Sequence, residues 1–163
     1  MSSVTIRRNV LLRSIVTEKL RKELAEELQN AADEVDQRVQ QLDFQTRAYI
    51  TDLQRTNLQQ AMAVRKQIEA EKHRQQELRD ALLERKAQVE ELEDGAEVVR
   101  GTLESYVELS VGDNIAEVLG GIEIVTKDDL VVEVRQRQTV DEGEESVAQL
   151  IQEVRSQSVG SNQ

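Results

Sequence analysis

The feature that most constrains this chain is a long central segment without a helix-breaking residue. From Glu18 to Asp94 the sequence contains neither glycine nor proline, and most of its residues are alanine and straight-chain helix formers. Thr17 stands where an N-cap belongs, and Gly95 stands where a C-cap glycine belongs. This pair of caps brackets 77 residues, which is far longer than an ordinary globular helix and is typical of a coiled coil.

The apolar stripe of this segment changes its spacing halfway. From Leu20 to Leu53 the stripe recurs about every 3.67 residues, which indicates a nearly straight packing seam. From Ala61 to Leu92 the stripe is interrupted by a polar gap and fits a heptad spacing better. The polar residues 54–57, which include two poor helix formers, separate the two halves.

Two arrangements fit this pattern, a continuous rod and an antiparallel hairpin. A continuous helix would be roughly 115 Å long and would pair with another chain. A hairpin that turns near residues 54–57 would have two arms, 18–53 and 58–93, each roughly 54 Å long. We favour the hairpin because it returns the chain to its first segment, whose strand-like sequence needs sheet partners to be stable.

The residues on either side of the helical segment have the patterns of β-strands. Residues 4–16 are rich in valine, leucine and isoleucine, and residues 103–111 alternate between two faces. Two further apolar runs, 122–126 and 130–135, flank a short polar turn and predict a compact β-hairpin. A kink or bulge is expected at Gly101.

We therefore predict an α+β fold, a long antiparallel helical hairpin joined to a small antiparallel β unit formed by the N-terminal strand and the C-terminal third. The predicted segments are the N-terminal strand (4–16), the helical hairpin (17–95, turning near 54–57), the rest of the β unit (96–136, with a short helix at 114–119) and a polar tail (137–163). The tail contains a short amphipathic pattern at 146–155, which either docks on another element or frays. The rest of the tail is expected to be disordered.

Composition and charge exclude several classes of function. The formal net charge of −11, with the acidic excess concentrated in the last third, disfavours nucleic acids and anionic membranes as partners. No apolar run approaches the length of a bilayer span, and the N-terminus does not have the pattern of a signal peptide. The absence of cysteine excludes disulfides and thiol chemistry. We expect a soluble, cytoplasmic protein.

No constellation of residues predicts catalysis, a metal or a cofactor. The sequence lacks a glycine-rich nucleotide-binding motif, a P-loop, a nucleophile elbow and a zinc-protease motif. Glu69, His73 and Glu77 share one helix face and could bind a metal weakly, but a solvated charged face explains them better. The pair Asp128-Asp129 is best explained as turn chemistry. We predict that the protein is not an enzyme.

Three stretches resemble the YlqD-like family of small bacterial proteins. They are VLLRSIVTEKL at 10–20, LDFQ within the coiled coil, and GTLESYVELSVGDN followed by GIEIVTKDDLVVEVR. The resemblance covers roughly residues 4–137 and is most specific from Val107 to Arg135. Members usually have Asp-Gly in the last turn; here Asp129 replaces the glycine, which disfavours a tight type I′ turn. The resemblance implies a coiled coil with a small β unit, and it implies no catalytic residue because no activity is established for the family.

The candidate interaction residues lie on the first helical arm. A turn centred at 55–56 would set the stripe of this arm opposite the polar residues 69–76. The hairpin would then be splayed there, or another chain would cover the stripe. Phe44 points about 200° away from the stripe and would anchor a partner protein or a second copy. The candidate residues are Val35, Val39, Leu42, Phe44, Tyr49, Ile50 and Leu53.

These observations favour a non-enzymatic coiled-coil interaction or structural protein that self-associates as a homo-oligomer, with a protein partner at the hairpin stripe or tip. The alternative is a translation- or RNA-associated binding protein that uses the N-terminal arginines Arg7, Arg8 and Arg13. The acidic balance of the chain argues against this alternative.

Overall fold

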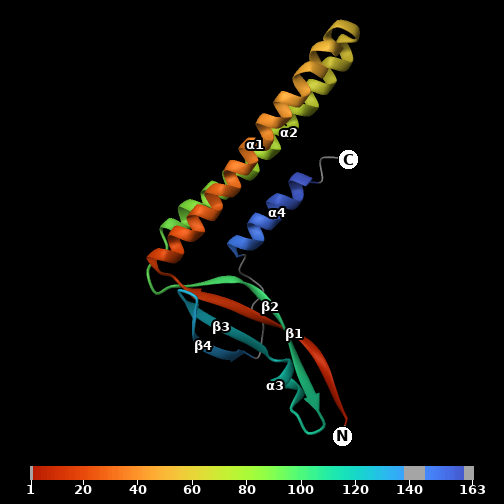
Figure 1. Cartoon of the computed structure of the whole chain (residues 1–163). Coiled ribbons are helices and arrows are strands. Elements are labelled where there is room, and N and C mark those ends of the chain that lie inside the picture. Colours follow the sequence, from red (N-terminus) through yellow and green to blue (C-terminus); the bar gives the residue numbers. More distant parts are fainter. Residues whose placement is uncertain (1, 138–145, 160–163) are drawn as a thin grey trace. The chain divides into compact units, whose positions relative to one another are not determined.

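The computed structural model describes residues 2–137 and 146–159 (Figure 1). Its elements are β1 (Ser3–Ile15), α1 (Glu18–Thr56), α2 (Leu58–Glu90), β2 (Glu97–Ser110), α3 (Ile115–Leu119), β3 (Gly121–Lys127), β4 (Leu130–Arg137) and α4 (Val147–Val159). The α+β fold class is confirmed: two long helices pack together, and strands from both ends of the chain form one sheet. The expectation of a disordered tail falls partly on 138–145 and 160–163, which lie outside the described residues.

The chain divides into two compact units. The first unit contains the four strands, α3, the first turns of α1 and the beginning of α4. The second unit contains the rest of the α1–α2 hairpin and the end of α4.

The α1–α2 hairpin turns over a single residue, Asn57 (Figure 1). The Asn57 side-chain oxygen accepts a hydrogen bond from the Gln60 amide at 3.1 Å, so Asn57 is the N-cap of α2. At the other end of α1, the Leu20 amide donates to the Thr17 hydroxyl oxygen at 3.2 Å, so Thr17 is the N-cap that the sequence predicts.

Polar pairs define the register of the two antiparallel helices. Arg79 Nε donates to Asp36 at 2.9 Å, Lys86 Nζ donates to Gln29 at 2.9 Å, and Lys72 pairs with Asp43. The residue numbers in each pair sum to 115, whereas a turn centred at 55–56 would give about 111. The register differs because α1 continues through Thr56 before the chain reverses.

The predicted C-cap of the helical segment is wrong. Helix α2 ends at Glu90, and Gly95 lies in the turn that leads to β2. There Gly95 has a φ of +87°, and its amide donates to the Val16 carbonyl oxygen at 3.0 Å. Contacts with the start of α1 replace a further helical turn: Arg21 donates to the Leu92 carbonyl oxygen at 2.9 Å and pairs with Asp94.

The sheet has the strand order β2-β1-β3-β4, so the N-terminal strand is an interior strand. β1 pairs antiparallel with β2 from Ser3↔Ser110 to Ile15↔Glu97. It pairs parallel with β3, where Val10 lies opposite Ile122. The sheet is therefore mixed, and the expectation of a purely antiparallel β unit is wrong at this pairing. The whole helical hairpin, β2 and α3 separate β1 from β3, which leaves ample chain for a parallel crossover.

A bulge interrupts β2 at the predicted place. Leu12 lies opposite Gly101 and Arg13 lies opposite Val99, so Arg100 is the extra residue. Gly101 has a φ of +150°, a value that side chains disfavour. The glycine therefore permits the backbone to bend at this point.

The β3–β4 turn has the backbone that Asp129 was expected to disfavour. Asp128 and Asp129 have φ values of +47° and +71°, and both are positive as a type I′ turn requires. The Thr17 hydroxyl donates to the Asp128 carboxylate at 2.7 Å, and the Lys19 ammonium lies 3.8 Å from the Asp129 carboxylate. The hydrogen bond from Thr17 at the start of α1 thus helps to hold a turn that the local sequence alone disfavours.

Each unit has its own buried apolar residues. In the first unit they include Val10, Leu11, Val16, Leu20 and Val125. In the second unit they include Leu24, Leu28, Ala31, Ala32, Val35, Ala61, Leu82 and Val89. The hairpin core is dense at the end near Leu28 and thins toward the turn, where Ala61 is the buried residue of α2.

We predict that Asp129→Gly stabilises the protein by about 0.5–1 kcal/mol, because glycine adopts a positive φ without strain. The lost contact with Lys19 contributes little because both side chains are mostly exposed. Urea unfolding measures the change. The matched control is Gly95→Ala, which should destabilise the protein by about 1 kcal/mol. An added Cβ at Gly95 would meet no neighbouring atom, so backbone strain at the positive φ would be the cause. A loss of stability in Asp129→Gly would contradict the explanation.

Candidate interaction surfaces

The end of α4 docks on the helical hairpin within the second unit. Arg155 donates two hydrogen bonds to the Glu34 carboxylate of α1, at 3.1 and 3.3 Å. Arg74 of α2 donates to the Gln157 carbonyl oxygen at 3.1 Å. Val154, between these contacts, is only 4% exposed. This part of α4 therefore lies against both helices of the hairpin.

This docking explains how the stripe of α1 avoids water near Val35. In the observed register Val35 still lies opposite polar residues of α2, near Asp80, yet it is 1% exposed. The neighbouring residue Glu34 holds Arg155, so a helix of the same chain supplies the cover that sequence analysis assigned to a splayed hairpin or another chain.

The other candidate residues differ in exposure without a trend along α1. Val39, Leu42, Ile50 and Leu53 are partly buried. Tyr49 is about half exposed, and Phe44 is 80% exposed. The structure thus does not bring the seven residues together as one surface, because Val35 belongs to the core and Phe44 points away from the seam.

Polar contacts replace apolar packing in the middle of the hairpin. The Lys72 ammonium pairs with Asp43 across the two helices. Its hydrogen bond to Asp43 raises the pKa of Lys72, while burial acts in the opposite direction. Gln75, which is buried, donates to the Glu71 carboxylate at 2.9 Å. The Lys72–Asp43 pair therefore joins the two helices here, whereas the Gln75–Glu71 hydrogen bond lies within α2.

Beyond this polar zone, the half of the hairpin next to the turn exposes large apolar side chains. On α1 they are Phe44 and Tyr49, and on α2 they are Leu58 and Met62. Each of the four is at least half exposed. Several large apolar side chains on one short length of hairpin are more than the scattered surface residues that need no explanation.

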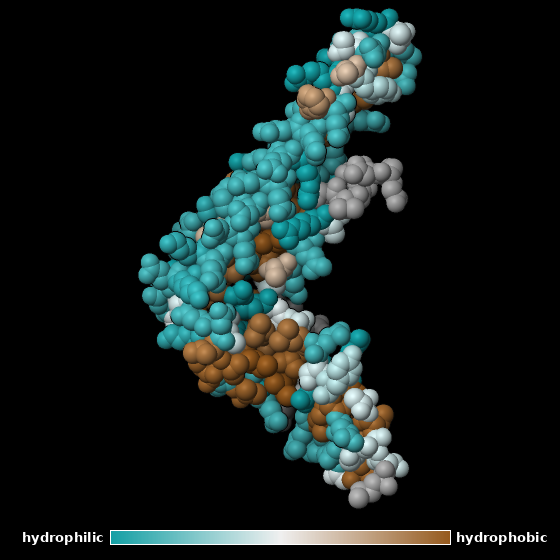
Figure 2. All heavy atoms as spheres, in the orientation of Figure 1, coloured by the Kyte–Doolittle hydropathy of each residue, from teal (hydrophilic) through white to brown (hydrophobic). Residues whose placement is uncertain are grey.

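The β4 strand carries the second exposed apolar surface. Leu130, Val131, Val132 and Val134 are between 52 and 71% exposed. Figure 2 shows a broad hydrophobic area over β3 and β4. This surface was not among the predicted interaction residues. The run LVVEV in the sequence indicates a strand, but only the strand order shows that β4 is an edge strand.

Charged side chains occupy the opposite face of the same strands. Arg13 Nε and the Glu123 carboxylate form a buried pair at 3.0 Å. Arg135 forms two hydrogen bonds with Glu97, at 2.6 and 2.9 Å, and a third with Glu133 at 2.9 Å. The hydrogen bond from Arg135 lowers the pKa of Glu133. These contacts connect β1 with β3 and β2 with β4 through side chains.

The three N-terminal arginines all have partners within the protein. Arg7 forms an ion pair with Glu104 at 3.4 Å, and Arg8 donates to the Val118 carbonyl oxygen at 3.2 Å. Arg13 is buried beside Glu123. These contacts do not form the exposed basic cluster that binding to a phosphate backbone requires.

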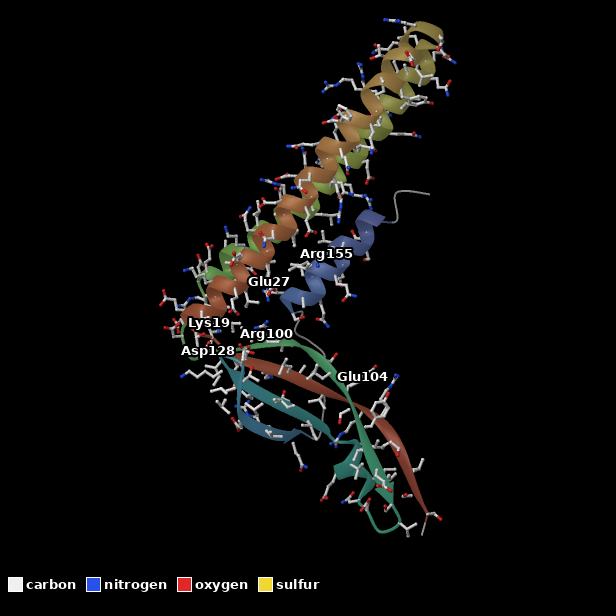
Figure 3. The ribbon with its side chains drawn as sticks, viewed as in Figure 1. Lys19, Glu27, Arg100, Glu104, Asp128 and Arg155 are labelled. Atoms are coloured by element: carbon white, nitrogen blue, oxygen red, sulfur yellow. The ribbon has the colours of Figure 1, made fainter. Side chains whose placement is uncertain are left out.

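A small polar pocket lies where β1 leads into α1. Ser14, Lys19, Arg100 and Asp128 contribute to its lining, and Figure 3 shows Lys19, Arg100 and Asp128 gathered at this end of the sheet. The Ser14 and Thr126 hydroxyl groups are 2.7 Å apart and share a hydrogen bond. The pocket's polar groups therefore largely bind one another, as in a structural junction.

The described residues contain neither a cluster of metal ligands nor a membrane-spanning helix. Within residues 2–137 and 146–159, no three histidine, aspartate or glutamate side chains gather so that they could hold a metal ion. His73 Nε2 lies 3.2 Å from the Glu77 carboxylate on an exposed helix face. None of the described helices is both long and apolar enough to cross a membrane.

These features define an α+β protein in which a mixed four-stranded sheet joins the two ends of a long helical hairpin. The chain belongs to the YlqD family, whose model, described as YlqD protein, matches residues 4–135. The family resemblance seen in the sequence is thereby confirmed. A crystal structure of a protein of unknown function from Synechococcus sp. WH 8102 is similar, with 27% sequence identity and a TM-score of 0.68. The match covers 82% of this chain and 95% of that chain. No curated protein matches the sequence.

We predict that Val154→Ala lowers the free energy of unfolding by about 1–2 kcal/mol, because it removes two buried methyl groups. Hydrogen exchange should also become faster at the amides of α4. The matched control is Arg155→Ala, whose ion pair with Glu34 is about half exposed and is expected to contribute less than about 1 kcal/mol. Equal effects of the two changes would show that apolar docking does not hold α4.

Proposed function

We propose that the protein is a non-enzymatic interaction protein that self-associates and presents the turn half of its helical hairpin to a partner protein. The observation that carries this proposal is the exposure of large apolar side chains, in particular on the hairpin near its turn and on β4. Exposed apolar patches of this kind mark protein–protein interaction sites in soluble proteins.

The exposed side chains of the hairpin suit the binding of a partner protein better than the binding of a small molecule. Phe44 and Tyr49 are aromatic, and exposed aromatic side chains are the most frequent anchors of protein interfaces. Both lie on a rigid helix, so little conformational entropy is lost when a partner binds. The surrounding side chains are polar and charged, which suits the rim of an interface.

The RNA-binding alternative has no structural observation in its favour. Its proposed contacts, Arg7, Arg8 and Arg13, are engaged with protein groups. The net charge of −11 also opposes association with a polyanion. We therefore do not propose it further.

Self-association predicts a dimer or a larger assembly in solution. Light scattering at tens of micromolar protein should give a mass at least twice that of the 18.5 kDa chain. Dilution should shift the mass toward that of the monomer, with little dependence on salt if apolar contacts dominate. A monomer throughout this concentration range would contradict self-association.

Removing the aromatic side chains of the hairpin should weaken the binding of its partner protein. The double change Phe44→Ala and Tyr49→Ala should leave stability nearly unchanged, because both side chains are exposed. Affinity for the partner should fall by a factor of roughly 30 or more per anchor. Affinity purification from the native cell measures this, with Gln45→Ala on the same exposed stretch as the control. An identical set of bound proteins from all three forms would contradict the hairpin surface.

A further inference from the structure

We propose that two copies of this chain associate by antiparallel pairing of β4 with the β4 strand of the second copy, which joins their sheets into one. This inference rests on the proposed self-association and names the surface and the register that produce it. The twofold axis would pass through Val134 of both copies.

Within residues 2–137 and 146–159, β4 has a pairing strand on one side only. The strand order places it at the end of the sheet, and no other strand of the described residues pairs with its outer side. Natural edge strands are shielded by charged side chains, proline, bulges or a cover. β4 contains no lysine or proline, its Glu133 and Arg135 bond to each other, and four of its apolar side chains are more than half exposed. Its one register irregularity lies near the turn, so the strand from Glu133 onward pairs regularly with β3.

The charged side chains of β4 are complementary to those of a second, antiparallel β4. In a symmetric antiparallel pair centred on Val134, Glu133 of each copy lies directly opposite Arg135 of the other. Centring the pair on Glu133 or on Arg135 would instead place like charges opposite one another on the axis. In the register through Val134 opposite charges face each other across the axis and the two Val134 side chains meet. Arg135 already donates to Glu97 and Glu133 of its own copy, so this register would extend that charged cluster across the axis.

The charges on the other edge of the sheet have a different pattern. β2 is also an edge strand, and the equivalent symmetric pairing centred on Tyr106 would set Glu104 opposite Glu108 of the second copy. Like charges directly opposite one another destabilise a strand pair. A bulge at Arg100 and Gly101 further distorts this edge. Symmetric pairing of β2 through Tyr106 is therefore disfavoured, whereas β4 has a register in which opposite charges meet.

Apolar side chains on β3 and β4 would add buried surface to the backbone pairing. Ile124 lies opposite Val134 in the β3–β4 pair, on the face away from Arg135. Pairing across the axis would place the valines of two such patches beside each other and bury a continuous apolar surface (Figure 2). This gain accompanies the new backbone hydrogen bonds.

The test compares Val134→Lys with Val4→Lys by light scattering and sedimentation. Both valines are more than half exposed strand residues, so circular dichroism and the thermal midpoint should change little in either variant. We expect Val134→Lys to raise the dimer dissociation constant by roughly 100-fold or more, since two lysines would face each other on the axis. Val4→Lys should associate as the unaltered protein does.

A cysteine crosslink tests the register independently of stability. The chain has no cysteine, so Val134→Cys introduces a single thiol. Mild oxidation should convert Val134→Cys to a disulfide-linked dimer, because directly opposite Cβ atoms lie about 4.5–5.5 Å apart. Val4→Cys should remain largely uncrosslinked.

The outcomes separate this inference from the proposed function. If the unaltered protein and Val134→Lys are both dimers, the β4 pairing is wrong but self-association stands. If the unaltered protein is a monomer, both are wrong. Equal crosslinking of Val134→Cys and Val4→Cys would also overturn the pairing, because it would show only random collisions.

Discussion

The structure depends on the interior position of β1 in the sheet. β1 directly precedes the helical hairpin, and β2 directly follows the hairpin. β1 pairs with β2 along almost the whole length of β1. The chain must therefore leave the sheet through α1 and return through α2 to the same place, where Arg21 donates to the Leu92 carbonyl oxygen at 2.9 Å. An isolated first strand would be unstable in water, so sheet formation and hairpin closure require each other. The β3–β4 hairpin then completes the other side of β1.

The hairpin itself is not uniformly apolar, and the structure resolves this in two ways. Near Val35 the end of α4 covers the stripe, with Arg155 and Val154 as the principal contacts. Further toward the turn, cross-helix pairs such as Lys72–Asp43 replace apolar packing. Large apolar side chains stay exposed around Phe44 and along β4, and others are exposed on β1, β2 and α3. For this reason the interaction proposals concern the surfaces around Phe44 and along β4, and not the whole stripe.

The candidate surfaces were only partly predictable. Helical periodicity places Phe44 away from the seam, and its exposure in the structure agrees with that position. Val35 satisfies the same apolar pattern as its neighbours, so no local signal separates a residue that α4 covers from one that stays open. The β4 surface could not be predicted because a run of valines is equally compatible with an interior and an edge strand. Its exposure follows from the strand order.

The sequence by itself determined the helical segment and the positions of the strands, and it favoured a reversal near residues 54–57 over a continuous rod. Propensity, capping and periodicity act over a few residues, so they can be read locally. Only the tertiary structure decided the parallel pairing of β1 with β3, the end of α2 at Glu90 and the positive φ of Asp129. Each of these depends on contacts between residues far apart in the chain or on how chain ends are held. The free energy of such contacts outweighs local preferences of about 1 kcal/mol per residue.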